Sequence, residues 1–192
     1  MEKIINDSSG EVLLMKHFIN DTESNHYFSE LMNCLSFEQQ DIVIFGSKVK
    51  IPRLESFHAE NGKSYGYSGK RLCTMPFNPV LLSLKTKIEG HFSIKFNSVL
   101  VNLYRNEKDS NGWHSDDEKE LGAKPIIASL SFGATRRFQL KHKNLPLKHT
   151  LNLENGDLVI MRGLLQSNWK HQIPKENYVC GPRINLTFRL IC

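Results

Sequence analysis

The feature that most restricts the fold is the pattern of the second half of the chain, from Phe96 onward. Short segments alternate polar and apolar residues there, and turn residues such as Asn155-Gly156-Asp157 separate them. These segments lie near residues 97–104, 125–132, 135–142, 150–161 and 182–191. Alternation places the apolar side chains on one face of a strand, so a succession of such strands predicts an antiparallel sandwich or jelly roll.

The first half of the chain adds helices to this sheet. Residues 11–19 predict an opening strand, and Asn20-Asp21-Thr22 then offers caps for a helix that extends to about Leu35. A second helix is predicted to begin at Asn78-Pro79. Apolar stripes at helical spacing are formed by Tyr27, Leu31 and Leu35 in the first helix and by Leu81, Leu84 and Ile88 in the second. The expected fold class is therefore mainly β with flanking helices (α+β), and both helices are expected to support the sheet.

Length and composition indicate one globular domain, because 192 residues with 40% hydrophobic content can bury a core of ordinary size. The chain contains no apolar run long enough for a membrane span, and its first residues lack the pattern of a signal peptide. We therefore expect an intracellular protein, in the cytoplasm or nucleus, that does not bind membranes and is a monomer.

The net charge of +5 suits a polyanionic partner such as nucleic acid, although many unrelated proteins are as basic. The basic residues are dispersed, so a folded surface would have to contact phosphate. The four cysteines form no Cys-x-x-Cys pair, which favours free thiols over a disulfide or a zinc site. They are Cys34, Cys73, Cys180 and Cys192.

The segment Trp113-His114-Ser115-Asp116-Asp117-Glu118 places an imidazole and a carboxylate two residues apart in a short polar loop after an apolar strand. Non-haem iron(II) oxygenases hold their metal with two histidines and one carboxylate and leave the other positions open. His114 and Asp116 are candidates for two of these ligands. Taken alone, such a pair is more often part of a solvated loop that has a charged tip.

The last strand-like segment strengthens this hypothesis. Its alternation places Arg183, Asn185, Thr187 and Arg189 on one face, and His171 lies just upstream. An arginine fork binds one carboxylate through two parallel hydrogen bonds, while a metal can chelate the other end of the same molecule. The alternative is an ordinary solvated sheet face with two arginines on it.

Together these residues resemble the AlkB family of Fe(II)- and 2-oxoglutarate-dependent dioxygenases. The resemblance is carried by His114-x-Asp116, His171, Arg183-x-Asn185-x-Thr187-x-Arg189, Asn102-Leu103-Tyr104 and Ser129-Leu130-Ser131-Phe132-Gly133. It extends from about residue 42 to residue 191 and is nearest to the branch that acts on duplex DNA. It implies a double-stranded β-helix (jelly roll) as the catalytic core in residues 97–192. Residues 1–96 would form an N-terminal extension with helices, a finger hairpin and a nucleotide-recognition lid.

The resemblance also implies the cofactors and the residues that bind them. Iron(II) would be bound by His114, Asp116 and His171, and dioxygen would be the oxidant. The cosubstrate 2-oxoglutarate would be bound by Asn102, Tyr104, Arg183, Asn185, Thr187 and Arg189, with Arg183 on its distal carboxylate and Arg189 supporting the keto-acid end.

The segments 42–53 and 64–69, read without the family, predict a hairpin and a turn-rich strand whose aromatic residues belong to the core. The resemblance instead implies that Phe45, with Gly46, forms a finger that fills the gap left by a flipped nucleotide. Tyr65 and Tyr67 would then contact the extruded base. One departure stands out: Lys175-Glu176-Asn177-Tyr178 occupies the place where duplex-acting members carry a basic cluster, so the resemblance does not establish a strong preference for duplexes.

Glu118 is the predicted contact for the base, with Asp117 beside it. Methylation of adenine at N1 or of cytosine at N3 makes the base a cation, which aromatic faces and carboxylates attract. The alternative is a polar loop that continues into Lys119-Glu120. The remaining histidines have no partners at ligand spacing and are interpreted as surface or core residues. They are His17, His26, His58, His91, His142 and His149.

The predicted function is oxidative demethylation of N-alkylated bases in DNA, with release of succinate, carbon dioxide and formaldehyde. The substrate base has to be flipped out or already single-stranded, because a stacked base cannot reach the metal. Two alternatives remain: an Fe(II)/2-oxoglutarate oxygenase acting on RNA, protein or lipid, and a catalytically silent nucleic-acid-binding protein.

Overall fold

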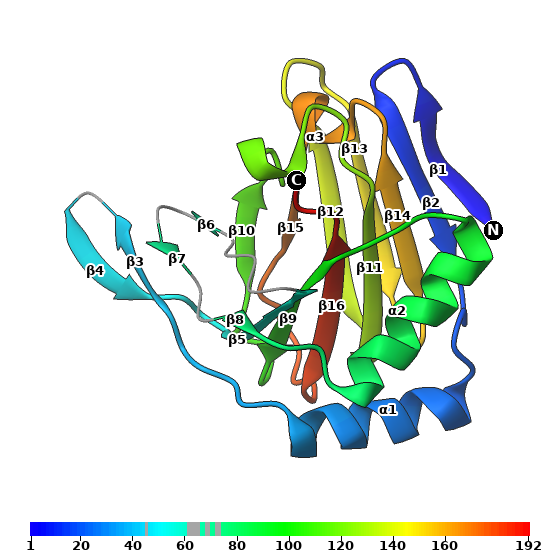
Figure 1. Ribbon diagram of the computed structural model, residues 1–192. Helices are drawn as coiled ribbons and strands as arrows, with labels where there is room; N and C mark the ends of the chain where they lie inside the picture. The colour runs from blue at the N-terminus through cyan, green and yellow to red at the C-terminus, as the bar shows by residue number, and fades with distance from the viewer. Residues whose placement is uncertain (45, 61–65, 68–69, 72–73) are drawn as a thin grey trace.

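The computed structural model describes residues 1–44, 46–60, 66–67, 70–71 and 74–192. Two β-sheets face each other, and two helices cover the outer side of the larger one (Figure 1). The larger sheet has eight strands in the order β1-β2-β14-β11-β16-β9-β5-β8, and the smaller sheet has four in the order β10-β15-β12-β13. Two separate hairpins, β3-β4 and β6-β7, complete the described strands. This mainly β architecture with flanking helices is a jelly roll, as predicted.

The strands of the larger sheet are β1 Glu2–Asp7, β2 Gly10–Met15, β5 Leu54–Ala59, β8 Thr74–Met75, β9 Ser98–Tyr104, β11 Ile127–Gly133, β14 Leu158–Arg162 and β16 Arg183–Arg189. Those of the smaller sheet are β10 Asn111–His114, β12 Arg136–His142, β13 Lys148–Leu153 and β15 Trp169–Ile173. The hairpins are β3 Asp41–Ile44 with β4 Ser47–Lys50, and β6 Gly66–Tyr67 with β7 Lys70–Arg71. The helices are α1 Asp21–Cys34, α2 Pro79–Phe92, the single-turn α3 Leu165–Asn168 and the 3-10 turn η2 Lys119–Leu121.

Both predicted helices are confirmed, including their caps. The side chain of Asn20 accepts a hydrogen bond from the backbone N–H of Glu23 at 3.0 Å, and Asn78 does the same for Leu81 at 2.8 Å. Each cap satisfies a backbone donor that the first helical turn would otherwise leave unpaired. The apolar stripe of α2 is fully buried against the larger sheet through Leu81, Leu84 and Ile88.

The strand β16 divides the core into two parts. Its apolar residues Ile184, Leu186 and Phe188 are fully buried in the cluster that also contains the inward sides of α1 and α2. The alternate residues of β16 are the polar ones, and they face the space between the two sheets, where a second apolar cluster surrounds Tyr104 and Trp169. Period-two alternation thus places the polar set of β16 inside the molecule, and the alternative of a solvated sheet face was wrong.

Several strands differ from the sequence prediction. The segment 150–161 is not continuous, because the turn Asn155-Gly156-Asp157 divides it into β13 and β14, which lie in different sheets. Gly156 has φ +81, a conformation that favours glycine. The strands β1, β5, β10 and β15 were not predicted. In β5 the buried positions include Glu55, Ser56 and His58, so hydrophobicity alone does not reveal a buried strand there.

The first 96 residues also contribute to the larger sheet, because β1, β2, β5 and β8 lie in it beside strands from the second half of the chain. The division into an extension and a catalytic core at residue 97 stays a prediction. The hairpin β3-β4 projects away from the body of the molecule (Figure 1). Among the described residues, no helix is long and apolar enough to span a membrane.

Candidate metal and cosubstrate site

Three predicted ligands, His114, Asp116 and His171, come together between the two sheets. Their candidate donor atoms all lie within 4.8 Å of one another. His114 ends β10 and is the register partner of His171 on β15, with ring centroids 4.2 Å apart. Asp116 follows in the loop after β10, and its Oδ1 lies 3.8 Å from Nε2 of His114. Strand pairing therefore positions the two imidazoles, and the short loop brings in the carboxylate.

The orientation of His114 is fixed by its own strand. Its Nδ1 lies 2.7 Å from the backbone carbonyl of Gly112, so this nitrogen carries the proton and donates it. Nε2 is then the acceptor nitrogen of the ring; it lies 3.8 Å from Oδ1 of Asp116 and accepts a hydrogen bond from Nδ2 of Asn111 at 3.3 Å. A hydrogen bond of this kind to the distal ring nitrogen is what orients a metal-binding histidine.

Asp116 is 1% exposed and is held as an anion inside the protein. Burial would raise its pKa, but Arg189, His171 and His114 outweigh that effect and lower the pKa to about 2. Its Oδ2 accepts a hydrogen bond from Nη2 of Arg189 at 3.0 Å, and its backbone N–H donates to the side chain of Gln166 at 2.9 Å. Its Oδ1 is buried with no hydrogen-bond partner in the described part of the chain.

Both imidazoles are held in the neutral form that metal ligation requires. Burial lowers the pKa of His171 to about 3, helped by the nearby His114 and opposed by Asp116. Burial also lowers the pKa of His114, again against the attraction of Asp116. Two neutral imidazoles beside a buried carboxylate oxygen with no partner form a donor set that fits Fe(II).

Arg183 lies in the same pocket on the first position of β16. It is 1% exposed, and burial lowers its pKa to about 10, so the guanidinium keeps its charge at neutral pH. Its Nη2 donates to Ser131 Oγ at 2.9 Å, whereas Nε and Nη1 are buried and have no acceptor among the residues described. Unpaired buried donors on a cation are costly, and a ligand carboxylate would satisfy them through a two-point contact. The geometry fits the distal carboxylate of 2-oxoglutarate.

The other predicted cosubstrate residues lie on neighbouring strands of the larger sheet. Register pairs Arg183 with Tyr104 and Asn185 with Asn102 across β16 and β9, so their side chains share one face. The remaining two, Thr187 and Arg189, follow on β16 and also line the pocket. A polar chain runs along this face: Thr187 Oγ1 donates to Asn185 Oδ1 at 3.1 Å, and Asn185 Nδ2 donates to Ser129 Oγ at 2.8 Å. The structure thus brings the whole predicted set into one pocket.

A buried arginine fixes the frame around the site. Arg136 is 0% exposed, and Cζ of its guanidinium lies 5.4 Å from the centroid of the Tyr104 ring. Cζ of Arg183 lies 5.3 Å from the same centroid. Its guanidinium donates to three backbone carbonyls, those of Asn106 at 3.1 Å and of Asp109 and Pro174 at 2.7 Å. Arg136 therefore ties the loop that leads into β10 to the segment that leaves β15.

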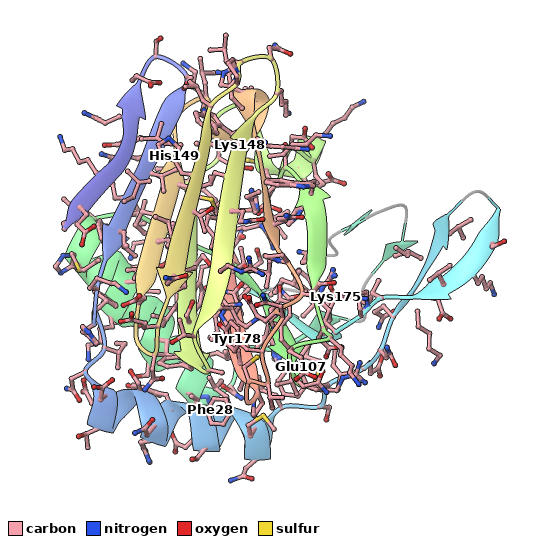
Figure 2. All side chains as sticks on the ribbon, turned by 180° about the vertical axis from the view of Figure 1, so that it is seen from behind. Phe28, Glu107, Lys148, His149, Lys175 and Tyr178 are labelled. Atoms are coloured by element: carbon pink, nitrogen blue, oxygen red, sulfur yellow. The ribbon has the colours of Figure 1, made fainter. Side chains whose placement is uncertain are left out.

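The same two segments are joined by a glutamate. The backbone N–H of Glu176 donates to the carbonyl of Glu107 at 3.0 Å, and Figure 2 labels Glu107 and Lys175 in the lower half of the view. The fully buried carboxylate of Glu176 lies 3.6 Å from Arg136 and accepts a hydrogen bond from Nε of Arg137 at 2.7 Å. Since β10 and β15 carry the two histidines, this contact network fixes their spacing.

The sequence prediction missed several residues of the site. Gln166 on α3 holds the backbone of Asp116, and Ser131 holds Arg183. The buried pair Arg53 and Glu55, 2.7 Å apart, adjoins Asn102, which accepts from Arg53 at 2.9 Å. Ser131 lies within a segment already identified by alternation, so its polar side chain in an apolar strand was a usable signal. Gln166 gave none, because it depends on how α3 packs.

The predicted substrate-binding residues are described only in part. Phe45 and Tyr65 lie outside the described residues, as does the side chain of Tyr67, which is part of β6. Gly46 is exposed at the tip of the hairpin with φ +79. Glu118 precedes the turn η2, and its Oε2 is buried. The assignment of these residues to a substrate stays a prediction.

Asp117, which the sequence placed beside Glu118, is directed elsewhere. Its carboxylate is 61% exposed and lies 3.5 Å from Nζ of Lys143. The remaining histidines join no cluster of three metal-binding side chains within the part of the chain that the structure describes. Cys34, Cys180 and Cys192 are free thiols, and Cys73 lies outside the described residues.

Comparison with known proteins agrees with the site. Residues 11–189 match the sequence model of the 2OG-Fe(II) oxygenase superfamily. Alpha-ketoglutarate-dependent dioxygenase alkB homolog 3 of Bos taurus is 42% identical over 94% of this chain, and DNA oxidative demethylase ALKBH2 of Homo sapiens is 36% identical over 78%. The chain spans 66% and 60%, respectively, of the length of these relatives.

Solved structures show the same fold. The structure of OsALKBH1 superposes with a TM-score of 0.68 at 16% identity, covering 98% of this chain and 100% of that one. A prolyl hydroxylase from Trichoplax adhaerens superposes with a TM-score of 0.63 at 8% identity, covering 93% of this chain and 83% of that one. The chain belongs to the 2OG-Fe(II) oxygenase superfamily and, within it, to the AlkB family.

Proposed function

We propose that this protein oxidatively dealkylates N-alkylated bases in nucleic acid, using Fe(II), 2-oxoglutarate and dioxygen, and that its substrates are N1-methyladenine and N3-methylcytosine in DNA. One observation carries the proposal: a single pocket contains two buried charged groups with polar atoms that lack hydrogen-bond partners in the described chain. The carboxylate oxygen of Asp116 faces two neutral imidazoles, and Arg183 presents two buried donors without an acceptor in the described chain. The names of the similar proteins, dioxygenase and DNA oxidative demethylase, support the same chemistry.

Each residue of the site has a role in this function. His114, Asp116 and His171 would bind the metal, and Arg189 orients Asp116 by donating to its second oxygen. Arg183 would bind the distal carboxylate of the cosubstrate, and Tyr104 lies beside it. The bound iron, with 2-oxoglutarate and dioxygen, supplies the oxidation of the N-alkyl carbon that ends in succinate, carbon dioxide, formaldehyde and the restored base.

The substrate preference follows from charge. An N1-methylated adenine or N3-methylated cytosine is a cation, so a carboxylate next to the metal favours it over the neutral base. We assign this role to Glu118, which lies two residues beyond Asp116, and the base contacts to Tyr65 and Tyr67. The base has to leave the stack to reach the metal.

The decisive experiment is incubation of the protein with iron and 2-oxoglutarate without oxygen, followed by addition of oxygen and a methylated oligonucleotide. Succinate, formaldehyde and restored base should appear in equal amounts. Succinate without base repair would move the protein to the alternative of an oxygenase acting on RNA, protein or lipid. Oligonucleotide binding without any succinate would identify a silent nucleic-acid-binding protein.

The finger assignment separates duplex from single-stranded substrates. A flipped base leaves a hole in a duplex, and an inserted aromatic ring recovers part of the stacking energy, whereas a single strand has no such hole. Phe45→Ala should therefore slow repair of N1-methyladenine in duplex DNA by at least about tenfold, or about 1.4 kcal/mol. Single-turnover rates on the matching single strand should change much less. Equal losses on both substrates would mean that Phe45 is a packing residue of the hairpin.

A further inference from the structure

The four-stranded sheet has an unusual charge composition. Its strands β10, β12, β13 and β15 contain no aspartate or glutamate, and their cationic residues are Arg136, Arg137, Lys141, Lys148 and Lys170. Two of these are accounted for, because Arg136 is buried at the site and Arg137 donates to Glu176. The three lysines are not explained by the site or by the core.

Strand register places the three lysines side by side. Lys141 on β12 is the direct partner of Lys148 on β13 and of Lys170 on β15. Directly paired residues point to the same face of a sheet, and neighbouring strands are about 4.8 Å apart. The residues next to them, such as His171 and Leu140, are buried, so the lysines form a row on the outer face. Lys148 and Lys170 are exposed, and Figure 2, which looks onto this side of the molecule, labels Lys148 on β13.

This lysine row, defined as Lys141, Lys148 and Lys170, lacks protein counterions. None of its ammonium groups forms an ion pair with a carboxylate in the described part of the chain, although nearby Lys143 pairs with Asp117. Like charges opposite one another in a sheet are destabilising. Because the three ammonium groups repel one another and no carboxylate offsets the repulsion, the lysine row is complementary in charge to an external polyanion.

The row also leads toward the site. Nζ of Lys141 lies 4.4 Å from the ring centroid of Trp113, a cation–π contact that holds the lysine against β10. Trp113 is followed directly by His114, and successive side chains of a strand point to opposite faces. One residue of β10 therefore contacts the lysine row while the next turns into the metal site, at the edge strand of the smaller sheet.

We propose that the lysine row binds the phosphate backbone of the nucleic-acid strand whose base enters the site. The proposal rests on the proposed function and extends it by a surface outside the pocket. Phosphates would bridge Lys170, Lys141 and Lys148, relieve their mutual repulsion and release counterions, which makes binding strongly dependent on salt. The contacts are sequence-independent and would hold the strand while a base is presented to the metal.

The test is the salt dependence of binding to a long unmodified single-stranded oligonucleotide. The triple variant Lys141→Gln, Lys148→Gln, Lys170→Gln should bind at least about tenfold more weakly at low ionic strength, and its log–log salt slope should fall by about 2, from three phosphates at about 0.7 each. The matched control Lys3→Gln, Lys87→Gln, Lys124→Gln loses the same charge from β1, α2 and the loop before β11. An equal slope for both triple variants would overturn the proposal, because net charge alone would then explain the loss.

A second measurement separates this proposal from the proposed function. Both triple variants and the wild type should dealkylate a methylated trinucleotide at the same rate, whereas only the lysine-row variant should show a raised KM for a long methylated strand. If the wild type repairs neither substrate, the proposed function fails and the binding test still decides the row. Loss of binding to phosphatidylserine vesicles, with oligonucleotide binding unchanged, would assign the row to a lipid surface and overturn the proposal.

Discussion

The two faces of the smaller sheet use similar residue types for opposite purposes. On β15, His171 points inward and is 6% exposed, whereas its neighbour Lys170 points outward and is exposed. On β12, Arg136 is fully buried and donates to three backbone carbonyls, whereas Arg137 is 37% exposed at its side chain and contacts one glutamate. A shift of one residue along a strand therefore decides whether a basic group is fixed inside or offered to solvent.

Burial changes what such a group can do. On the inner face, burial holds the pKa of His171 far below its usual range. Burial also makes each hydrogen bond that Arg136 donates costly to lose. Outside, a lysine gains little from any single partner, because solvent screens its charge. Inner residues should therefore show large individual effects on mutation, whereas the lysine row should act only as a group.

The largest contrast is expected between neighbours on β15. His171→Ala removes one of three metal-binding side chains and should lower turnover of 2-oxoglutarate by at least about a thousandfold, or about 4 kcal/mol. Lys170→Ala should leave turnover on a methylated trinucleotide within about twofold, since the ammonium faces away from the pocket. Succinate formation measures turnover, and titration with Co(II) measures loss of the metal site directly. A His171→Ala protein that still turned over 2-oxoglutarate would exclude this residue as a ligand.

The next contrast concerns stability, at the neighbours on β12. Arg136→Met leaves three buried carbonyls without a donor and removes a partner of Glu176, so the free energy of unfolding should fall by about 3–5 kcal/mol. Arg137→Met should cost less, about 1–2 kcal/mol, because its side chain is partly exposed, although the buried carboxylate of Glu176 loses one donor. Urea denaturation of both variants gives the two values. Similar losses at both positions would show that Arg136 does not tie the loops together.

Much of this organisation was predictable from sequence. The helices α1 and α2 carry their caps and stripes in a few adjacent residues, and β16 shows its two faces by simple alternation. The ligands and arginines could be proposed because together they resemble the AlkB family, whereas each pattern taken alone had an ordinary structural alternative. Such local patterns survive folding, because each is enforced by the geometry of one helix or strand.

What could not be predicted depends on contacts between distant segments. The role of Arg136 requires carbonyls from residues 106, 109 and 174, and that of Gln166 requires α3 to pack against the loop of Asp116. The lysine row is equally hidden, because Lys141, Lys148 and Lys170 become neighbours only once strand register is known. In the sequence the basic residues are dispersed, whereas in the folded sheet these three lysines lie in one row.

A smaller effect is expected at Arg183, where charge and shape can be separated. Arg183→Lys keeps a cation but loses the fork that binds a carboxylate at two points, so the affinity for 2-oxoglutarate should fall about ten- to a hundredfold, or about 1.4 to 2.8 kcal/mol. Arg162→Lys, at a partly exposed position of β14, is the matched control and should change nothing. Isothermal titration with 2-oxoglutarate in the presence of Mn(II) measures both. An unchanged affinity for Arg183→Lys would place the carboxylate site elsewhere.

Measured per pH unit, the smallest effect, and the most direct measure of burial, is the pH dependence of stability in the metal-free protein. The folded-state pKa of His171 is about 3, below the ordinary value of 6.5, so between these values the unfolded chain binds a proton that the folded chain does not. The free energy of unfolding should therefore rise with pH across this window, by up to about 1.4 kcal/mol per pH unit from this residue, and be lost as the pH falls. The pKa of Asp116 is about 2 in the folded protein, below the ordinary value of 3.8. Protonation of Asp116 therefore also lowers the free energy of unfolding as the pH falls, but only in stronger acid.

His171→Gln isolates this contribution, because glutamine does not titrate and a neutral polar side chain remains in place. With a chelator present, urea unfolding between the two pKa values of His171 should give a shallower rise of stability with pH for this variant than for the wild type. His26→Gln, at a histidine 69% exposed on α1, is the matched control for the exchange of side chain itself. If the slope is the same in all three proteins, His171 is not held neutral by burial, and the inner face of the sheet would differ from the outer face in position but not in electrostatics.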